Sequence, residues 1–439
     1  MAKFNAIIVG AGEINFGSPE GPWNHTARLE RLLGDSLNVL SLVDPDLERS
    51  KARLAEKRAV RMPPSIPRAW ASTLVHLSLE QAASELGPNV AVDLIVLGCP
   101  PHFRGSLAPG KDSDLQMLQL FPQSRGFLIE KPIAAVNPFE SDCHQVAQSF
   151  QAWQQRGKVT GAPRVVSVGY MLRYNKAITK LRQLMAENHL VPTAISARYY
   201  MAYEHAVKLS WWNKQVSCGP VVEQATHFVD LIRFLAGTAD NEALLDSVRA
   251  TSLDHDKEAG RLAKLGFDES VVPPEDRVPR ITSAFWRHRR GTIASLTHAI
   301  TLHGNKYDTE LEVLADGWIF RVRDAYEPIT TLSVKGPGVE GEQVFKIQDD
   351  PFFSEFETLI RAIRAQPSSQ DCEDCEGEKQ RLQEGTSSNS TRKAPVIAPP
   401  LPLSDYSEAL KTYELTWRIR LAAEESKASS LGALGTRQH

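Results

Sequence analysis

Residues 6–15 read Ala-Ile-Ile-Val-Gly-Ala-Gly-Glu-Ile-Asn, an apolar run that leads directly into the glycines Gly10 and Gly12. The run is typical of a parallel strand buried on both faces. Glycines at its end permit a tight turn, and they let backbone N–H groups approach a pyrophosphate at the start of the next helix. The order of strand, glycines and helix therefore favours dinucleotide binding, and the alternative is a tight turn without a ligand.

The glycine motif departs from the usual pattern in two places. Asn15 stands where a third glycine is usual, and residues 16–23 form an insertion rich in Gly and Pro. Either Gly17 or Gly21 takes the close-packing role, or the phosphate loop is longer than usual. We expect the first helix after the insertion at 25–33.

Three further apolar runs extend this pattern through the first 150 residues, at 39–43, 94–97 and 126–129. Helix-length segments separate them, which indicates a doubly wound parallel sheet. We therefore predict an α/β fold in which residues 1–150 are a dinucleotide-binding Rossmann domain.

The second part of the chain, residues 151–439, has a different pattern. Predicted strands follow one another closely, without helices between most of them, at 165–172, 193–201, 247–253, 281–287, 291–300, 307–323 and 330–336. This succession predicts an α+β domain with a large, mainly antiparallel open sheet. A helix is expected at 220–236 and another from 406 to about 425, the latter capped by Ser404 or Asp405. Residues 366–400 are polar and predict a disordered insertion.

Composition limits the kinds of partner. The 439 residues carry a net charge of −3, which offers no general attraction to nucleic acid or to an anionic membrane surface. No stretch approaches the about 18–20 apolar residues of a spanning helix, so we expect a cytoplasmic protein with a small-molecule partner. The five cysteines are scattered, as reduced thiols are. Only Cys372 and Cys375 have metal-like spacing, and without a second pair we expect no metal site.

Asp44 ends the second predicted strand, in the order Leu42-Val43-Asp44-Pro45. A carboxylate there can accept hydrogen bonds from the adenosine ribose hydroxyls of NAD, and it would repel the 2′-phosphate of NADP. The residue thus favours NAD, with NADP as the less favoured cofactor. The alternative is a turn-forming role before Pro45.

Glu130-Lys131-Pro132 follows the strand at 126–129. A lysine at the carboxyl end of a parallel strand lies where open α/β sheets bind ligands. Partial burial would lower its pKa and suit it to proton transfer. Taken alone, such a lysine is more often a solvated surface residue.

The helix predicted at 220–236 concentrates polar groups on one stripe. At about 100° per residue, Glu223, His227 and Asp230 fall within an arc of about 60°. One interpretation is an acid/base histidine with an orienting carboxylate. The other is a solvated polar face on which Glu223 satisfies His227.

Together these motifs resemble the Gfo/Idh/MocA family of NAD(P)-dependent oxidoreductases. The resemblance rests on the Val-Gly-Ala-Gly turn, on Glu130-Lys131-Pro132, and on the spacing of Glu223, His227 and Asp230. Cys99-Pro100-Pro101-His102 is similar to the family's T-P-x-x-H loop, with Cys for Thr and the His one residue early. Residues 169–174 resemble the first strand of the family's substrate domain.

The resemblance implies hydride transfer between the nicotinamide and a hydroxyl or carbonyl carbon of a sugar, polyol or similar molecule. Catalytic roles are implied for Lys131, His227 and Glu223, the last replacing the family's usual Asp. The implied cofactor-binding residues are Gly10, Gly12, Glu13, Ile14, Asn15, Asp44, Cys99, Pro100, His102, Glu130 and Lys131. Substrate contacts are expected from Arg173, Tyr174, Tyr203, His205, Trp211, Trp212 and His227, and the family also implies a homo-oligomer, either a dimer or a tetramer.

Two other functions remain open from the sequence. The fold also serves as a dinucleotide-sensing regulator without turnover, and a third possibility is an NAD-assisted reaction with no net redox change. The presence of Lys131, Glu223 and His227 favours an enzyme, because a sensor needs no acid/base pair.

Overall fold

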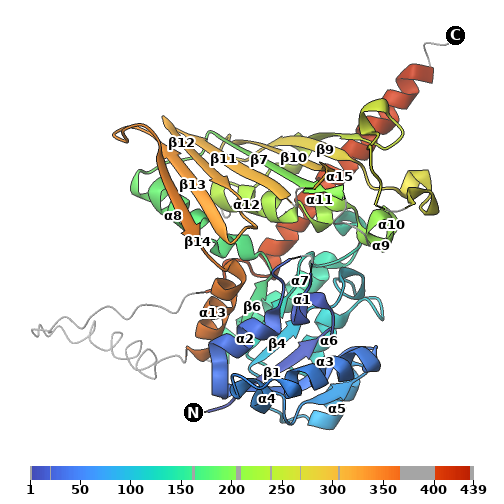
Figure 1. The fold of residues 1–439 in the computed structure, drawn as a ribbon, viewed down its shortest axis with the longest axis vertical. Coiled ribbons are helices and arrows are strands. Elements are labelled where there is room, and N and C mark those ends of the chain that lie inside the picture. The colour runs from blue at the N-terminus through green and yellow to red at the C-terminus, as the bar shows by residue number, and fades with distance from the viewer. Residues whose placement is uncertain are drawn as a thin grey trace, which may run out of the picture.

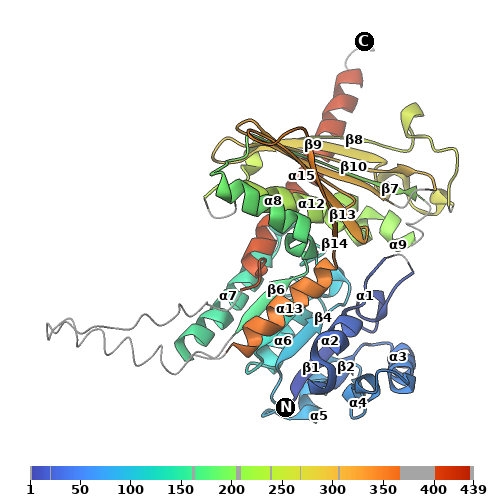
Figure 2. The same cartoon turned by 60° about the vertical axis from the view of Figure 1, so that its left-hand side comes forward.

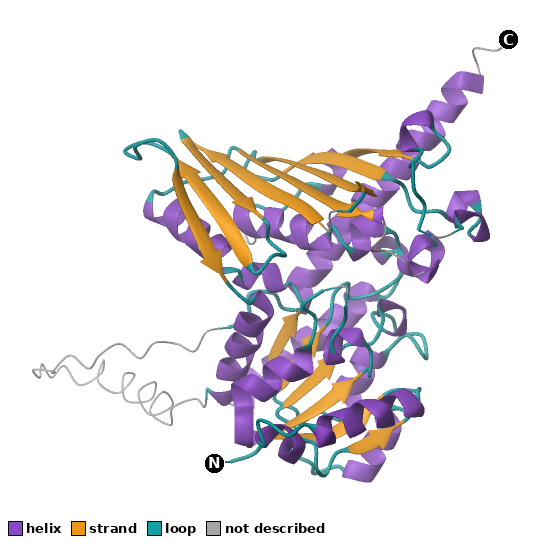
Figure 3. Cartoon of the chain, viewed as in Figure 1, coloured by secondary structure: helices purple, strands orange, loops and turns teal. Residues whose placement is uncertain are grey.

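The structure is a computed structural model that describes residues 2–19, 21–160, 164–203, 209–237, 240–266, 268–304, 307–365 and 401–435. The chain forms a lower α/β layer structure and an upper sheet with helices between the two (Figures 1 and 3). His205, Cys372, Cys375 and the segment predicted to be disordered, 366–400, lie outside the described residues.

The first sheet is parallel and has the strand order β3-β2-β1-β4-β5-β6. Its strands are β1 (Phe4–Val9), β2 (Leu37–Val43), β3 (Leu74–His76), β4 (Leu94–Leu97), β5 (Gly126–Ile129) and β6 (Val165–Val168). This is the doubly wound order of dinucleotide-binding domains, whose ligands bind at the carboxyl ends of the strands. The predicted α/β fold is confirmed.

Helices cover both faces of this sheet: α1 (Glu13–Phe16), α2 (His25–Leu33), α3 (Leu47–Ala59), α4 (Ser65–Ala69), α5 (Leu79–Leu86), α6 (Ser113–Leu120) and α7 (Cys143–Thr160). Side-chain caps fix where several of them begin. Asn24 accepts a hydrogen bond from the N–H of Ala27, and Asp46 accepts one from Arg49. The start of α3 therefore lies immediately after the turn that carries Asp44.

The second sheet has eight strands in the order β14-β13-β12-β11-β7-β10-β9-β8, and only the β7–β10 pair is parallel. Its strands are β7 (Ala194–Ala202), β8 (Arg249–Leu253), β9 (Ile281–Arg287), β10 (Ile293–Leu302), β11 (Tyr307–Ala315), β12 (Trp318–Arg323), β13 (Ile329–Lys335) and β14 (Gln343–Gln348). Helices α8 (Lys176–Glu187) and α12 (Thr226–Ala236) cover the face that is turned toward the first domain (Figure 1). The predicted mainly antiparallel sheet is thus confirmed.

Three local expectations differ from the structure. The strand predicted at 165–172 is not part of the antiparallel sheet; β6 pairs with β5 in the parallel sheet, and a 3₁₀ helix at Met171–Tyr174 follows it. All four residues of β6 are buried, as expected for a strand covered on both faces. The segment 307–323 is a hairpin that turns at Asp316 and Gly317, both with positive φ. Strands β3 and β14 were not predicted.

Two helices late in the chain return to the first domain (Figure 2). Helix α13 (Pro351–Arg364) packs its apolar face against the core of the parallel sheet, where Ile363 lies against Gly126. Helix α15 (Tyr406–Gly435) begins where Asp405 accepts a hydrogen bond from Glu408 N–H, which selects Asp405 from the two predicted caps. In the described ranges, no helix is long and apolar enough to cross a membrane.

Candidate active site

A cavity of about 970 Å³ lies between the two domains, at the carboxyl edge of the parallel sheet. Most of the residues predicted from the sequence line it: Gly10, Gly12, Glu13, Ile14, Asp44, Cys99, Pro100, His102, Glu130, Lys131, Trp211, Glu223 and His227. Its walls come from both domains. The predicted residues Asn15, Arg173, Tyr174, Tyr203 and Trp212 are not among its lining residues.

The glycine turn opens one end of this cavity. Gly10 has φ +97°, and a Cβ there would lie 3.1 Å from the backbone of Gly98 and Cys99. A Cβ on Gly12 would meet nothing within 4 Å, so the backbone at this position faces open space. Asn15 takes the place of the third glycine by donating from Nδ2 to the carbonyls of Val9 and Gly10, at 3.1 and 2.7 Å. The side-chain amide of Asn15 therefore stabilises the glycine turn.

The insertion at 16–23 reaches from the first domain to the second. Pro19, Gly21, Pro22 and Trp23 line the cavity, and Trp23 also packs against the hydrophobic core of the second domain. The segment returns to α2 through Asn24, whose Nδ2 donates to the carbonyl of Phe16 at 3.1 Å. The one-turn helix α1 begins directly after the glycine turn, so the extra length lies between α1 and α2 and not in the turn itself.

Asp44 lies beside the glycine turn with only 5% of its surface exposed. Its Oδ2 accepts a hydrogen bond from Ala11 N–H at 2.7 Å. Its Oδ1 accepts from Asp46 N–H at 2.8 Å and from Arg49 Nη2 at 2.7 Å. Asp44 thus fixes the glycine turn as well as lining the cavity.

Lys131 is positioned by the turn that follows β5. Its peptide bond to Pro132 is cis, and its Nζ donates to the carbonyl of Glu223 at 2.8 Å. Burial lowers the pKa of Lys131 below its usual value, and the nearby Glu223 and Glu130 carboxylates oppose that shift. Lys131 therefore reaches across the cavity to the second domain.

The carboxylate of Glu130 stabilises the same turn. Its Oε1 lies 2.6 Å from Nε2 of the buried His25, and its Oε2 accepts from Lys131 N–H at 3.1 Å. Burial would raise the pKa of Glu130, but the hydrogen bond and charge of His25 lower it overall. Gly169 makes room for this carboxylate, since a Cβ there would lie 3.0 Å from both of its oxygens.

Arg104 is a site residue that the sequence did not reveal. Its buried guanidinium donates to the carbonyls of Glu130 and Pro132, at 2.8 and 2.9 Å, and to the carbonyl of Cys99. It thereby joins the loop after β4 to the loop that carries Lys131. Its Nη1 also lies 3.8 Å from the Cys99 sulfur. Because most of these partners are backbone carbonyls, no spacing pattern in the sequence pointed to Arg104.

The helix expected at 220–236 is interrupted between Glu223 and His227, the two residues on it that were predicted to be catalytic. Helix α11 (Pro220–Glu223) ends at Glu223, and α12 begins at Thr226. Between them the N–H of Ala225 bonds to the carbonyl of Pro220 at 3.0 Å, five residues back. Such an i→i−5 bond widens one helical turn, a distortion that is frequent at functional sites.

The polar stripe predicted on this helix is divided by the fold. Glu223 and His227 face the cavity, whereas Asp230 is buried in the second domain. There its two carboxylate oxygens accept from Nε and Nη2 of Arg173, each at 2.7 Å. Asp230 therefore orients Arg173, and it is not the partner of His227.

Burial sets the protonation of the groups that do face the cavity. It raises the pKa of Glu223 to about 7, an increase that the charges of Lys131 and Arg104 oppose. Burial and the neighbouring Lys131 charge lower the pKa of His227 well below its usual value, so the imidazole is neutral at pH 7. Nδ1 of His227 is buried and lacks a hydrogen-bond partner among the described residues. Nε2 is consequently the nitrogen left for a ligand in the cavity.

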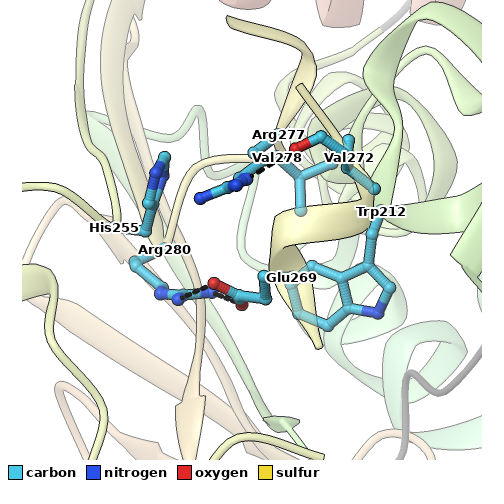
Figure 4. A pocket seen from close by; sticks show the side chains of 7 residues that line it. All are labelled: Trp212, His255, Glu269, Val272, Arg277, Val278 and Arg280. Carbon is cyan, nitrogen blue, oxygen red and sulfur yellow. Dashed lines mark hydrogen bonds and ion pairs between the residues drawn. The ribbon is translucent and has the colours of Figure 1, made fainter. Parts of the chain in front are cut away.

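Four of the residues predicted to contact substrate do not line the large cavity and have other partners. Arg173 pairs with Asp230, and the hydroxyl of Tyr174 accepts from Leu403 N–H at 2.8 Å. Tyr203 donates to Glu269 at 2.7 Å. Trp212 lies beside the paired Glu269 and Arg280 at a small separate cavity (Figure 4). Of the described tyrosines and tryptophans predicted to contact substrate, only Trp211 lines the large cavity, which His227 also lines.

Three tyrosines that the sequence did not single out line the cavity near His227: Tyr199, Tyr307 and Tyr326. Their ring centroids lie 5.5–5.8 Å from one another, and the ring of Tyr326 is 6.1 Å from that of His227. They come from β7, from β11 and from the loop after β12. Because tertiary folding alone brings them together, no local sequence signal could have identified them.

Comparisons with known proteins agree with this architecture. A family model described as "Putative oxidoreductase C terminal domain" matches residues 173–318. The Schizosaccharomyces pombe protein named uncharacterized protein UNK4.17 is 36% identical over 95% of this chain and 90% of its own length. The chain belongs to the Gfo/Idh/MocA family of oxidoreductases.

Solved structures of this family share the fold at low identity. The WlbA dehydrogenase from Chromobacterium violaceum, in complex with NADH and UDP-GlcNAcA, is 16% identical with a TM-score of 0.57, covering 97% of this chain and 95% of the other. The transcriptional regulator Gal80p from Kluyveromyces lactis is 10% identical with a TM-score of 0.64, covering 97% and 90%. At these identities the likeness shows the fold alone.

The turn before α11 is formed by two residues with positive φ. Cys218 has a φ of +64°, a left-handed conformation that favours glycine. The next residue, Gly219, also has a positive φ, of +81°. Two consecutive residues of this kind turn the chain sharply into α11, which brings Glu223 to the cavity. The described residues contain no cluster of His, Cys, Asp and Glu able to hold a metal ion.

Proposed function

We propose that the protein is a nicotinamide-dinucleotide-dependent oxidoreductase that acts on a hydroxyl or carbonyl carbon of a sugar, polyol or similar oxygen-rich molecule. One observation carries the proposal: Lys131, Glu223 and His227, from two domains, line the same cavity as the glycine turn. An acid/base group beside a dinucleotide-type loop is the arrangement that alcohol oxidation requires. The related WlbA dehydrogenase, crystallised with NADH, supports the choice of cofactor class.

The cavity suits such a cofactor at its phosphate end. Gly12 leaves its backbone open, and Gly10 permits the close turn beneath it. We assign the pyrophosphate to Gly10, Gly12, Glu13 and Ile14, and the adenosine ribose to Asp44. Cys99, Pro100, His102 and Glu130 continue the same wall toward Lys131. A dinucleotide bound there supplies or accepts the hydride.

Lys131 and His227 handle the proton and the charge on the substrate oxygen. A secondary alcohol gives up hydride only as its oxygen loses a proton, which the neutral His227 accepts at Nε2. Lys131 uses one of its three N–H donors on the Glu223 carbonyl, so the others are left to stabilise the developing alkoxide. Because the pKa of Glu223 is about 7, its carboxyl group gains or loses a proton near neutral pH, which changes the net charge of the site.

The substrate end of the cavity is aromatic. Tyr199, Tyr307, Tyr326 and Trp211 line it. Aromatic faces pack against the C–H surfaces of a sugar or polyol, and hydroxyl tips bind its polar groups. These side chains support an oxygen-rich ring or chain as the substrate.

The test is to screen sugars, polyols and inositols for NADH formation at 340 nm, and then to compare Lys131→Ala and His227→Ala with wild type. We expect each variant to lose about 10²- to 10⁴-fold in kcat while still binding NADH. The controls Lys51→Ala and His144→Ala, both exposed and away from the cavity, should turn over normally. Near-normal turnover in both Lys131→Ala and His227→Ala would contradict the proposal.

The same screen separates the other functions. A regulator would bind the dinucleotide but turn over no substrate. A reaction without net redox change would convert substrate without accumulating NADH.

A further inference from the structure

Gln224 is a polar residue of the cavity wall that the proton transfer does not use. It follows Glu223 directly, precedes His227 by three positions, and lines the cavity together with both. Its backbone lies in the widened turn, where the carbonyl of Pro220 accepts from the N–H groups of Gln224 and Ala225, at 2.9 and 3.0 Å. The residue is therefore fixed in the same short segment that brings Glu223 and His227 to the cavity.

A buried histidine of the second sheet orients the side chain of Gln224. His298 lies in β10 with 1% of its surface exposed, and its Nε2 is 3.0 Å from Oε1 of Gln224. Burial lowers the pKa of His298 to about 3, so its imidazole is neutral at pH 7. The ring packs edge-on against Tyr199 of the cavity wall, with centroids 5.1 Å apart, and its Nδ1 is buried without a partner among the described residues. The hydrogen bond of this imidazole therefore serves to hold the Gln224 amide.

The Gln224 amide keeps hydrogen-bonding capacity for a ligand. A primary amide has one carbonyl acceptor and two N–H donors, and His298 occupies only one end of it. The other end has no protein partner within the described ranges, and the half-buried side chain is open to the cavity that it lines. A hydroxyl group both donates and accepts, so it can bind this end whichever way the amide is turned. The amide is thus fixed at one end and free for a hydroxyl at the other.

We propose that Gln224 binds a substrate hydroxyl next to the carbon that is oxidised, and that His298 is a positioning residue that acts through Gln224. The closeness of Gln224 to His227 places this contact beside the reacting carbon, and an amide held in one orientation fixes which hydroxyl meets His227. The inference rests on the proposed function and narrows its substrate class. The substrate is a molecule with hydroxyl groups on adjacent carbons, and a compound with one isolated hydroxyl is a poor substrate.

Pairs of compounds that differ by one hydroxyl test this assignment. The sugar, polyol or inositol that wild type oxidises fastest is compared with its deoxy analogue, which lacks the hydroxyl beside the oxidised carbon. We expect the deoxy analogue to lose about tenfold in kcat/KM with wild type, the effect of one hydrogen bond. Gln224→Ala should lose a similar factor on the parent compound, mainly through KM, and less than threefold more on the deoxy analogue. Its Kd for NADH should change less than threefold, and the control Gln183→Ala, an exposed amide of α8, should match wild type.

Variants of His298 test the positioning role. His298→Leu removes the bond to Gln224 and should raise KM as Gln224→Ala does, whereas His298→Gln keeps a polar group there and should recover part of the loss. A thermal melt shows whether each variant is folded, and if His298→Leu is not, the half-buried Gln224 alone decides the test.

The outcomes separate this inference from the proposed function. If wild type uses the deoxy analogue as well as the parent compound, or if the losses from Gln224→Ala and from the missing hydroxyl multiply, Gln224 does not bind that hydroxyl and the proposed function stands. If wild type oxidises no sugar, polyol or inositol, the proposed function fails and the inference fails with it.

Discussion

The buried pair of Arg173 and Asp230 offers a sharp test of how the second domain is held together. Both side chains are 1% exposed, and two hydrogen bonds of 2.7 Å join them. Thr412 of α15 also donates to Asp230 at 2.8 Å, and Arg173 donates to the carbonyl of Leu403. The pair therefore ties α12 to α15 and to the segment that precedes it.

Asp230→Asn keeps the shape of the side chain and removes its charge. The Arg173 guanidinium then keeps only the more distant Glu408 carboxylate, 3.8 Å from its Nη2, as a counter-ion. Loss of a buried charge partner typically costs about 3–5 kcal/mol, and we expect a loss near the lower end of that range. Since whole domains are stable by only about 5–15 kcal/mol, this is a large loss. In the double variant Arg173→Met/Asp230→Leu neither charge is present, and we expect it to recover more than half of that loss.

Urea unfolding followed by tryptophan fluorescence and far-ultraviolet circular dichroism measures the change. The matched control is Asp240→Asn, which breaks the exposed Asp240–Arg290 pair at 3.0 Å and should cost no more than about 0.5 kcal/mol. A loss below about 1 kcal/mol for Asp230→Asn would refute the argument. A wild-type-like stability combined with a raised substrate KM would instead favour the substrate role that the sequence suggested for Arg173.

Two further predictions concern the cavity. Gly12→Ala should leave the melting temperature nearly unchanged, because the added Cβ meets nothing within 4 Å. The variant should bind NADH roughly tenfold more weakly, because the methyl group fills the space where the phosphate binds. A wild-type Kd for NADH would show that Gly12 is not part of the cofactor site. Glu223 has a folded pKa of about 7, above the ordinary 4.5 of a glutamate, so its contribution favours folding at low pH and is lost as pH rises from about 4.5 to about 7. Glu223→Gln cannot ionise and should gain stability relative to wild type across that window; parallel curves of melting temperature against pH for the two proteins would contradict this.

The parts of the molecule that could be predicted are those encoded by local pattern. Uninterrupted apolar runs located β1, β2, β4 and β5, and glycine chemistry located the turn at Gly10 and Gly12. Lys131 and His227 were both placed by motif, and the fold brings them to one cavity. In each case a short segment contains the whole signal.

The parts that could not be predicted depend on partners far away in the chain. Arginine is a residue type that often binds substrates, but Arg173 is paired with Asp230, 57 positions later in the chain. The break after Glu223 is invisible to a periodicity that assumes one continuous helix. Strand β6 was assigned to the wrong sheet because its register with β5 is decided by tertiary pairing. Arg104 donates mainly to backbone carbonyls, which every sequence contains.

Helix α15 has a consequence for how the molecule admits its ligands. Over its first turns the helix contributes Tyr406, Leu410, Tyr413 and Trp417 to the core of the parallel-sheet domain, and from the same stretch Leu415 and Ile419 enter the core of the second domain. The single helix α15 thus packs into the cores of both domains, and α13 also contributes side chains to both cores. A wide hinge opening would have to pull buried side chains out of one core, which is costly. Ligand exchange should consequently proceed through local movements around the cavity rim, with the spacing between Lys131 and His227 fixed once the chain has folded.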